Sequence, residues 1–227
     1  GSAFNPGLGN TSAYLVAKQT AYLLDCGSTV FSSLFPLLPW DSLHAIKVLV
    51  SHRHQDHTGS LGTLISFATH VKNIPVTVVH PDCKLQPLLA LMGVAEDQYV
   101  FECTTAFCDE SLQVDFMPVK HSDKIPAFGL RLKMGQQHVY YSGDSSGLPG
   151  EVLKDYLSGR LDNLYQDISF LTQNPSGHGS FEALKQQVPR QMRARVFPIH
   201  WDTDARQLIL DAGFGLVDLV KREDDQP

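Results

Sequence analysis

The stretch VLVSHRHQDHTGS, residues 48–60, places three histidines and an aspartate directly behind an apolar, β-branched run. Such a run is typical of a buried strand. If the strand continued, His52, His54 and Asp56 would share one face and His57 would not, and in a helix the two nearest histidines would splay apart. We therefore expect a loop after the strand, in which a turn makes all four side chains converge.

Three imidazoles and a carboxylate are a typical set of metal ligands. The alternatives are a solvated histidine-rich loop or a purification tag, but a tag would lie at a terminus and would not contain Asp56. Three further candidates end predicted strands: His121 in MPVKH, Asp144 in YYSGD and His200 in VFPIH. Strand ends at one edge of a sheet sandwich lie close together, so these residues can complete a site for two metal ions.

The remaining histidines have weaker contexts. We expect His44, His70, His80 and His138 to be ordinary surface or hydrogen-bonded residues, although His80 also ends a predicted strand. His121 has a competing interpretation as a surface histidine before the polar segment SDK.

Short β-like runs separated by helix-like segments follow one another along the chain. Period-two or β-branched runs predict strands at 12–17, 20–27, 45–52, 74–80, 112–121, 128–134, 138–144, 163–171 and 194–201. Helical spacing predicts helices at 60–71, 87–94, 150–159, 180–188 and 204–213. Two β-rich blocks with helices between and after them indicate an α/β protein with sheets packed face to face and helices outside. We expect one domain over residues 1–227.

Composition narrows the class of protein. The net charge is −6 with neutral histidines and no basic run is visible, which disfavours a long nucleic acid as partner. No apolar run approaches the roughly 18 residues that a membrane span needs, and the first residues do not resemble a signal peptide. The four cysteines show no C-x2-C spacing, so we expect four reduced thiols and a cytoplasmic protein.

The segment SHRHQDHTG resembles the H-x-H-x-D-H signature of the metallo-β-lactamase superfamily. In order along the chain, GSAFNPGLGNTSAYLV, LLDCGST, HSDKIPAFGLRL, YYSGDSSG and PIHWD resemble segments of its ribonuclease-Z-like branch. The resemblance implies a four-layer αββα sandwich. It also implies that one metal ion is held by His52, His54, His121 and Asp144 and a second by Asp56, His57, His200 and Asp144, with Asp144 bridging. Zinc is the default metal, and manganese or iron would also suit these ligands.

Two departures from ribonuclease Z argue against transfer RNA as a partner. Only 22 residues separate His121 from Asp144, which is enough for a hairpin but not for the RNA-gripping arm of ribonuclease Z. Gln166-Asp167 also stands where that enzyme has a catalytic His-Glu pair. His178 resembles a different histidine, which precedes a helix near the site in many members of the branch. It is either catalytic or merely a cap of the helix at 180–188.

We therefore expect a metal-dependent hydrolase in which a dinuclear site activates a bridging hydroxide. Asp56 would orient this nucleophile and His178 would be the general acid. The expected substrate is a small phosphodiester or a short nucleic acid. One alternative is a carboxylic ester, lactone or thioester, and another is a non-catalytic metal-binding regulatory protein. A homodimer is a further expectation.

Overall fold

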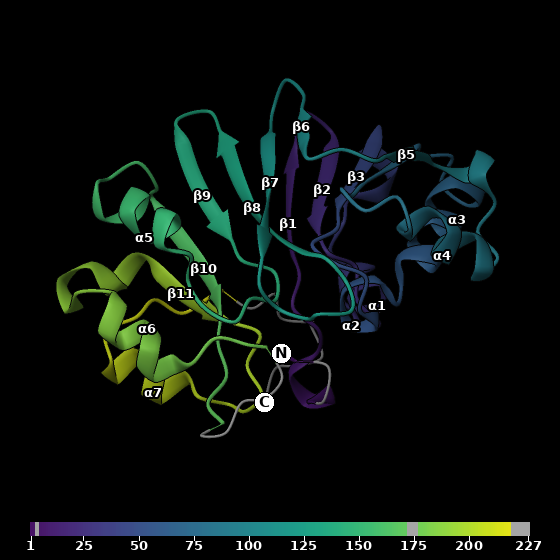
Figure 1. Cartoon of the computed structure of the whole chain (residues 1–227). Helices are drawn as coiled ribbons and strands as arrows, with labels where there is room; N and C mark the ends of the chain where they lie inside the picture. The colour runs from purple at the N-terminus through teal and green to yellow at the C-terminus, as the bar shows by residue number, and fades with distance from the viewer. Residues whose placement is uncertain (3–4, 172–176, 219–227) are drawn as a thin grey trace.

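Two β-sheets face each other in the computed structural model, which describes residues 1–2, 5–171 and 177–218 (Figure 1). The first sheet has the order β1–β2–β3–β4–β5, with an antiparallel β1–β2 hairpin followed by parallel pairs. Its strands are β1 (Ala13–Ala17), β2 (Thr20–Leu24), β3 (Ala45–Leu49), β4 (Val76–Val79) and β5 (Val100–Glu102).

The second sheet has the order β11–β10–β9–β8–β7–β6. Its pairs are parallel from β11 to β9 and antiparallel from β9 to β6. Its strands are β6 (Ala106–Cys108), β7 (Gln113–Val119), β8 (Ala127–Met134), β9 (Gln137–Tyr141), β10 (Asn163–Asp167) and β11 (Val196–Ile199).

Helices cover the outer face of each sheet (Figure 1). The α-helices are α1 (Val30–Leu34), α2 (Gln55–Thr58), α3 (Leu61–His70), α4 (Leu85–Leu91), α5 (Gly150–Leu157), α6 (Phe181–Gln187) and α7 (Arg206–Asp211). Short 3-10 helices lie at η1 (Pro6–Leu8), η2 (Trp40–Ser42), η3 (Glu96–Gln98) and η4 (Arg190–Arg195). None of the helices in the described ranges is long and apolar enough to cross a bilayer.

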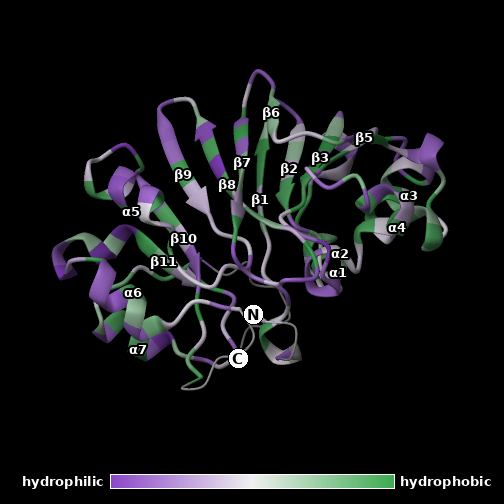
Figure 2. Ribbon diagram, in the orientation of Figure 1, coloured by the Kyte–Doolittle hydropathy of each residue, from purple (hydrophilic) through white to green (hydrophobic). Residues whose placement is uncertain are grey.

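Three apolar clusters mark the interfaces between four layers. One joins the first sheet to α1, α3 and α4, and includes Ile46, Val78 and Leu64. A second joins β9, β10 and β11 to α5, α6 and α7. The third lies between the sheets and includes Leu49 and Leu130. In Figure 2 the strands β1, β2 and β3 are largely hydrophobic. The predicted αββα sandwich is therefore confirmed, and a single domain over residues 1–227 stays a prediction.

The metal-ligand segment differs from the expected loop. After β3 the chain is irregular only as far as His54, whose backbone is extended, and α2 then makes one helical turn. The carbonyl of His54 accepts hydrogen bonds from the backbone N–H groups of His57 and Thr58 and from the Thr58 hydroxyl. Because α2 begins at Gln55, residues 52 and 54 lie before the helical turn and residues 56 and 57 lie within it.

The expectation of four reduced thiols is wrong for one pair of cysteines. Cys83 follows β4, Cys103 follows β5, and the two form a disulfide with their Cα atoms 5.3 Å apart. Spacing along the chain could not reveal this pairing, because it depends on the ends of two neighbouring parallel strands. Cys26 and Cys108 are free. The predicted cytoplasmic location loses the support that four thiols gave it.

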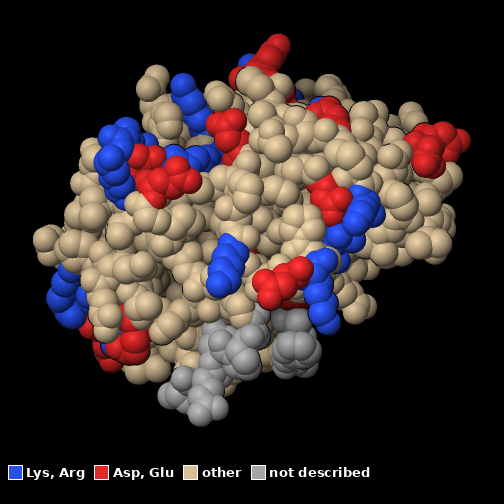
Figure 3. Space-filling view, viewed as in Figure 1, with Lys and Arg blue, Asp and Glu red and all other residues tan. Residues whose placement is uncertain are grey.

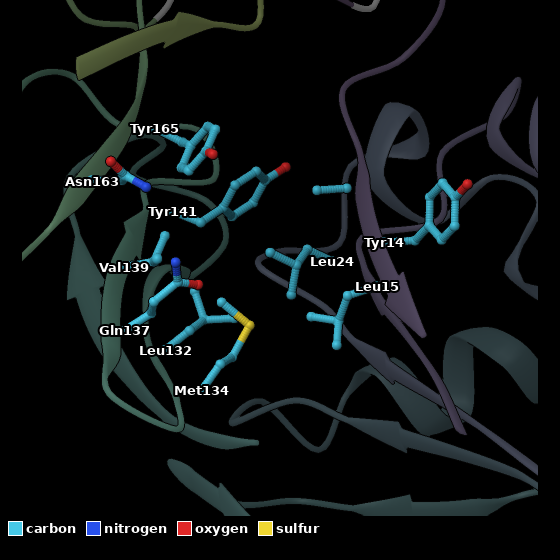
Figure 4. A pocket seen from close by; sticks show the side chains of 11 residues that line it. Tyr14, Leu15, Leu24, Leu132, Met134, Gln137, Val139, Tyr141, Asn163 and Tyr165 are labelled. Atoms are coloured by element: carbon cyan, nitrogen blue, oxygen red, sulfur yellow. The ribbon is translucent and has the colours of Figure 1, made fainter. Parts of the chain in front are cut away.

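An apolar pocket of about 220 Å³ lies between the sheets, beside β1 (Figure 4). Leu15 and Leu24 line it from the first sheet, and Met134 and Tyr141 line it from the second. None of the seven predicted metal ligands lines this pocket, so it is separate from the histidine-rich site.

Candidate metal centre

The carboxyl ends of the strands position the candidate ligands. His52 and His54 follow β3, His121 follows β7, Asp144 follows β9 and His200 follows β11. Parallel strands bring their carboxyl ends to the same edge of a sheet. Residues far apart in the sequence therefore meet at one edge of the sandwich.

The first ligand group contains His52, His54, His121 and Asp144. Nδ1 of His54 lies 3.0 Å from Nε2 of His52 and 3.2 Å from Nε2 of His121. Oδ2 of Asp144 lies 3.6 Å from Nε2 of both His52 and His121. Three ring nitrogens and one carboxylate oxygen thus surround a common point.

The second ligand group contains Asp56, His57, Asp144 and His200. Nε2 of His200 lies 3.2 Å from Oδ2 of Asp56 and 3.3 Å from Oδ1 of Asp144. Nε2 of His57 lies 3.0 Å from the same Asp144 oxygen. The two oxygens of Asp144 therefore face different groups.

These residues fit divalent metal ions. His57 Nε2 and Asp144 Oδ1 are buried and 3.0 Å apart, yet neither has a hydrogen-bond partner among the described residues. Buried polar atoms are normally paired. Unpaired atoms that converge with other nitrogen and oxygen donors are what a cation between them would satisfy, and this donor set suits zinc, manganese or iron.

A fully buried aspartate, Asp25, orients the second group from behind. Nδ1–H of His57 donates to Oδ2 of Asp25 at 2.9 Å, which leaves Nε2 of His57 free to face Asp144. The Asp25 carboxylate also accepts from the backbone N–H and hydroxyl of Ser51 and from the Tyr141 hydroxyl. Asp25 and His200 both have left-handed φ angles, +64° and +62°, conformations that are uncommon outside glycine.

Asp167 is a site residue that the sequence did not assign. It is fully buried at the end of β10, and its Oδ2 accepts from Nδ1–H of His178 at 2.7 Å and from the backbone N–H of Ser145. Its Oδ1 lies 3.5 Å from Nδ1 of His200. The available signal was an aspartate that ends an apolar strand, as Asp144 does.

His178 lies beside the two ligand groups, in contact with His200 and His121. Its ring stacks on His200 with centroids 4.7 Å apart and is tilted against His121 at 5.0 Å. The residue that caps α6 is Ser180, whose side chain accepts from the backbone N–H of Ala183. The interpretation of His178 as merely the cap of this helix is therefore wrong.

Burial and neighbouring charges shift the pKa values of the carboxylates and imidazoles at the site, and for Asp144 and His178 the two effects oppose each other. Burial would raise the pKa of Asp144, but His57 and His200 hold it well below its usual range. Burial and the neighbouring His57 lower the pKa of His52 well below its ordinary value, which favours the neutral ring that a metal ligand needs. Burial would lower the pKa of His178, but the hydrogen bond and charge of Asp167 raise it above the usual value.

The four histidines set aside in the sequence lie outside both ligand groups. His80 is fully buried and its Nδ1–H donates to the Val50 carbonyl at 2.8 Å. His70 contacts the side chain of Gln98. These contacts agree with the expectation of ordinary hydrogen-bonded histidines.

The sandwich and its histidine-rich edge define a protein with the metallo-β-lactamase fold. The crystal structure of the metallo-β-lactamase fold protein YhfI from Bacillus subtilis superposes with a TM-score of 0.72, at 18% identity, over 97% of this chain and 93% of that one. The short form of human tRNase Z superposes with a TM-score of 0.68, at 18% identity, over 96% and 93%.

Within that class, the family model described as Anti-Pycsar protein Apyc1 matches residues 1–224, and the chain belongs to this family. The Anti-Pycsar protein Apyc1 of Paenibacillus harenae is 23% identical over 88% of this chain and 86% of its own length. The probable metallo-hydrolase YhfI of Bacillus subtilis is 26% identical over 60% of this chain, in an alignment that spans only 57% of YhfI. The relatives and the ligand groups together support a metal-dependent hydrolase.

Proposed function

We propose that this protein hydrolyses a small phosphodiester with two divalent metal ions, by default zinc. The observation that carries the proposal is the position of Asp144, whose two carboxylate oxygens each face a separate group of ligands. The first group would hold one ion and the second group the other. We also propose that this protein acts as an anti-Pycsar protein, as the description of its family states.

Bound metal ions would supply Lewis acidity towards phosphoryl oxygens and lower the pKa of an attacking water. Asp56, only 8% exposed, is placed to orient that water and to accept its proton. His178 is the proton donor to the leaving oxygen, because Nδ1–H of its ring donates to Asp167 at 2.7 Å and its ring stacks on His200 beside the ligand groups. The raised pKa of His178 favours the protonated form that this role needs.

Two features favour a small substrate. The chain between His121 and Asp144 is occupied by the β8–β9 hairpin, so no long arm is inserted there. Lys and Arg are interspersed with Asp and Glu on the face shown in Figure 3, and the net charge is −6. A phosphodiester is favoured over other substrates because tRNase Z, by its name a ribonuclease, shares this fold.

A carboxylic ester, lactone or thioester remains the second candidate, because the same arrangement could polarise a carbonyl. A non-catalytic metal-binding protein is disfavoured, because both ligand groups and the His178–Asp167 pair are complete. A homodimer in the cytoplasm remains a prediction.

The decisive experiment combines metal analysis with a substrate panel. Protein purified without chelator should contain about two equivalents of metal. It should cleave bis(p-nitrophenyl) phosphate or a nucleoside 3′,5′-cyclic monophosphate faster than a set of lactones and thioesters. Metal content that stays near zero after reconstitution with zinc, manganese or iron would refute the proposal, and a clear preference for lactones would favour the second candidate.

A further inference from the structure

Three cross-links tie together the carboxyl ends of β3, β4 and β5, the neighbouring parallel strands behind the first ligand group. Nδ1–H of His80 donates to the carbonyl of Val50 at 2.8 Å. Nη2 of Arg53 lies 2.9 Å from Oδ2 of Asp82. One residue further on, Cys83 is bonded to Cys103 after β5. The loop that carries two ligand histidines is thus attached to the loop after β4, and that loop is attached to β5.

Arg53 is the most important residue of these three cross-links, because it lies between the candidate ligands His52 and His54 in the chain. Its side chain is only 17% exposed and that of Asp82 only 15%. Arg53 Nε and Asp82 Oδ2 are buried without a hydrogen-bond partner in the described part of the chain. The contact is therefore an ion pair of close charges rather than an aligned hydrogen bond. Removing one partner would leave a largely buried charge uncompensated.

We infer that the Arg53–Asp82 ion pair positions the first ligand group by fixing the backbone between His52 and His54. This inference rests on the proposed function, in which these two histidines hold a metal ion. Nε2 of His52 and Nδ1 of His54 lie 3.0 Å apart, and a metal needs both at defined distances. A backbone held at Arg53 keeps both imidazoles aimed at one point before the metal binds. Arg53 and Asp82 are thus positioning residues that need not touch the metal or the substrate.

Arg53→Gln separates this role from simple electrostatics, because the two predict opposite signs. Removing a positive charge near a cation site should by itself strengthen metal binding. Loss of positioning should instead weaken the binding of one zinc equivalent about tenfold, the lower end of the usual effect of outer-shell substitutions. The other equivalent should bind as in the wild type. The measurement is zinc affinity for each equivalent, by competition with a chromophoric chelator.

Lys72→Gln is the matched control, because it also removes one positive charge from an ion pair. Nζ of Lys72 lies 2.8 Å from Oδ1 of Asp41. This variant should bind both zinc equivalents with wild-type affinity. The double variant Arg53→Gln/Asp82→Asn conserves net charge and leaves no unpaired buried ion. It should fold even if the single variant does not, and should also weaken one equivalent. Circular dichroism checks the fold of each variant.

The outcomes separate this inference from the proposed function. Wild-type protein that binds no zinc would refute both. Wild-type protein with two equivalents, together with unchanged or tighter binding in Arg53→Gln and in the double variant, would refute only the positioning role. Equal weakening of both equivalents would also refute it, since that is the result of a general loss of stability.

Discussion

At the scale of single residues, the sequence marks Asp56 as a candidate metal ligand, and the structure gives its distances to two other candidate ligands. Its Oδ2 lies 3.2 Å from Nε2 of His200 and 3.5 Å from Nε2 of His57. It lies in a helical turn of only four residues and contributes little to the apolar core. Under the proposed function, its side chain therefore serves the chemistry far more than the fold.

Asp56→Ala should reduce kcat by a factor of at least about 10², the scale expected when a positioned base is lost. Unfolding by denaturant should show a change in stability that is small in comparison. The assay is steady-state hydrolysis of bis(p-nitrophenyl) phosphate at saturating zinc, with metal content measured on the same sample. Near-normal turnover with metal still bound would show that another group positions the nucleophile.

His178→Ala should affect substrates according to their leaving groups. p-Nitrophenolate leaves without help, whereas an alkoxide needs a proton from the acid. The variant should therefore lose much more kcat/KM on an alkyl phosphodiester than on bis(p-nitrophenyl) phosphate. His138→Ala, a change far along β9 from Asp144, is the control. An equal loss on both substrates would reduce His178 to a structural residue.

At the scale of elements, the loop after β2 and the turn of α2 pack with almost no space between them. A Cβ placed on Gly27 would lie 1.8 Å from the backbone oxygen of Asp56. The N–H of Cys26 already donates to the carbonyl of His57 at 2.8 Å. Glycine at position 27 is therefore required by the close approach of two backbones, and through them it sets the position of the second ligand group.

Gly27→Ala should lower the free energy of unfolding by about 3 kcal/mol, the upper part of the usual range for overpacking. Metal content should fall as well, because the added carbon displaces the backbone of Asp56. Gly150→Ala is the control, since a Cβ there meets no atom within 4 Å at the start of α5. Wild-type stability in Gly27→Ala, measured by urea denaturation, would mean that α2 can shift freely.

At the scale of the whole molecule, the long elements and the convergence of the candidate ligands could be predicted from the sequence, because both leave local patterns. Buried strands such as β3 leave β-branched runs, and the H-x-H-x-D-H segment is contiguous. What could not be predicted depends on contacts between distant segments. Asp167 acquires its contact with His178 only in the folded chain, where the two side chains lie 2.7 Å apart. The Cys83–Cys103 bond needs β4 and β5 side by side. The strands β5 and β6, with three residues each, are too short to show a period.

The overall charge and shape of the molecule also predict its preference for substrate size. Binding to a long polyanion gains affinity from many phosphate contacts, and each contact makes binding more sensitive to salt. This chain has a net charge of −6 and only a hairpin between β7 and the end of β9, so a long substrate should add little. We expect kcat/KM for a small phosphodiester to equal or exceed that for precursor transfer RNA, with a weak dependence on salt between 50 and 200 mM. Both substrates should be compared with the same preparation at saturating metal. A strong preference for precursor transfer RNA that declines steeply with salt would mean that the folded surface gathers a basic face which neither the net charge nor the hairpin reveals.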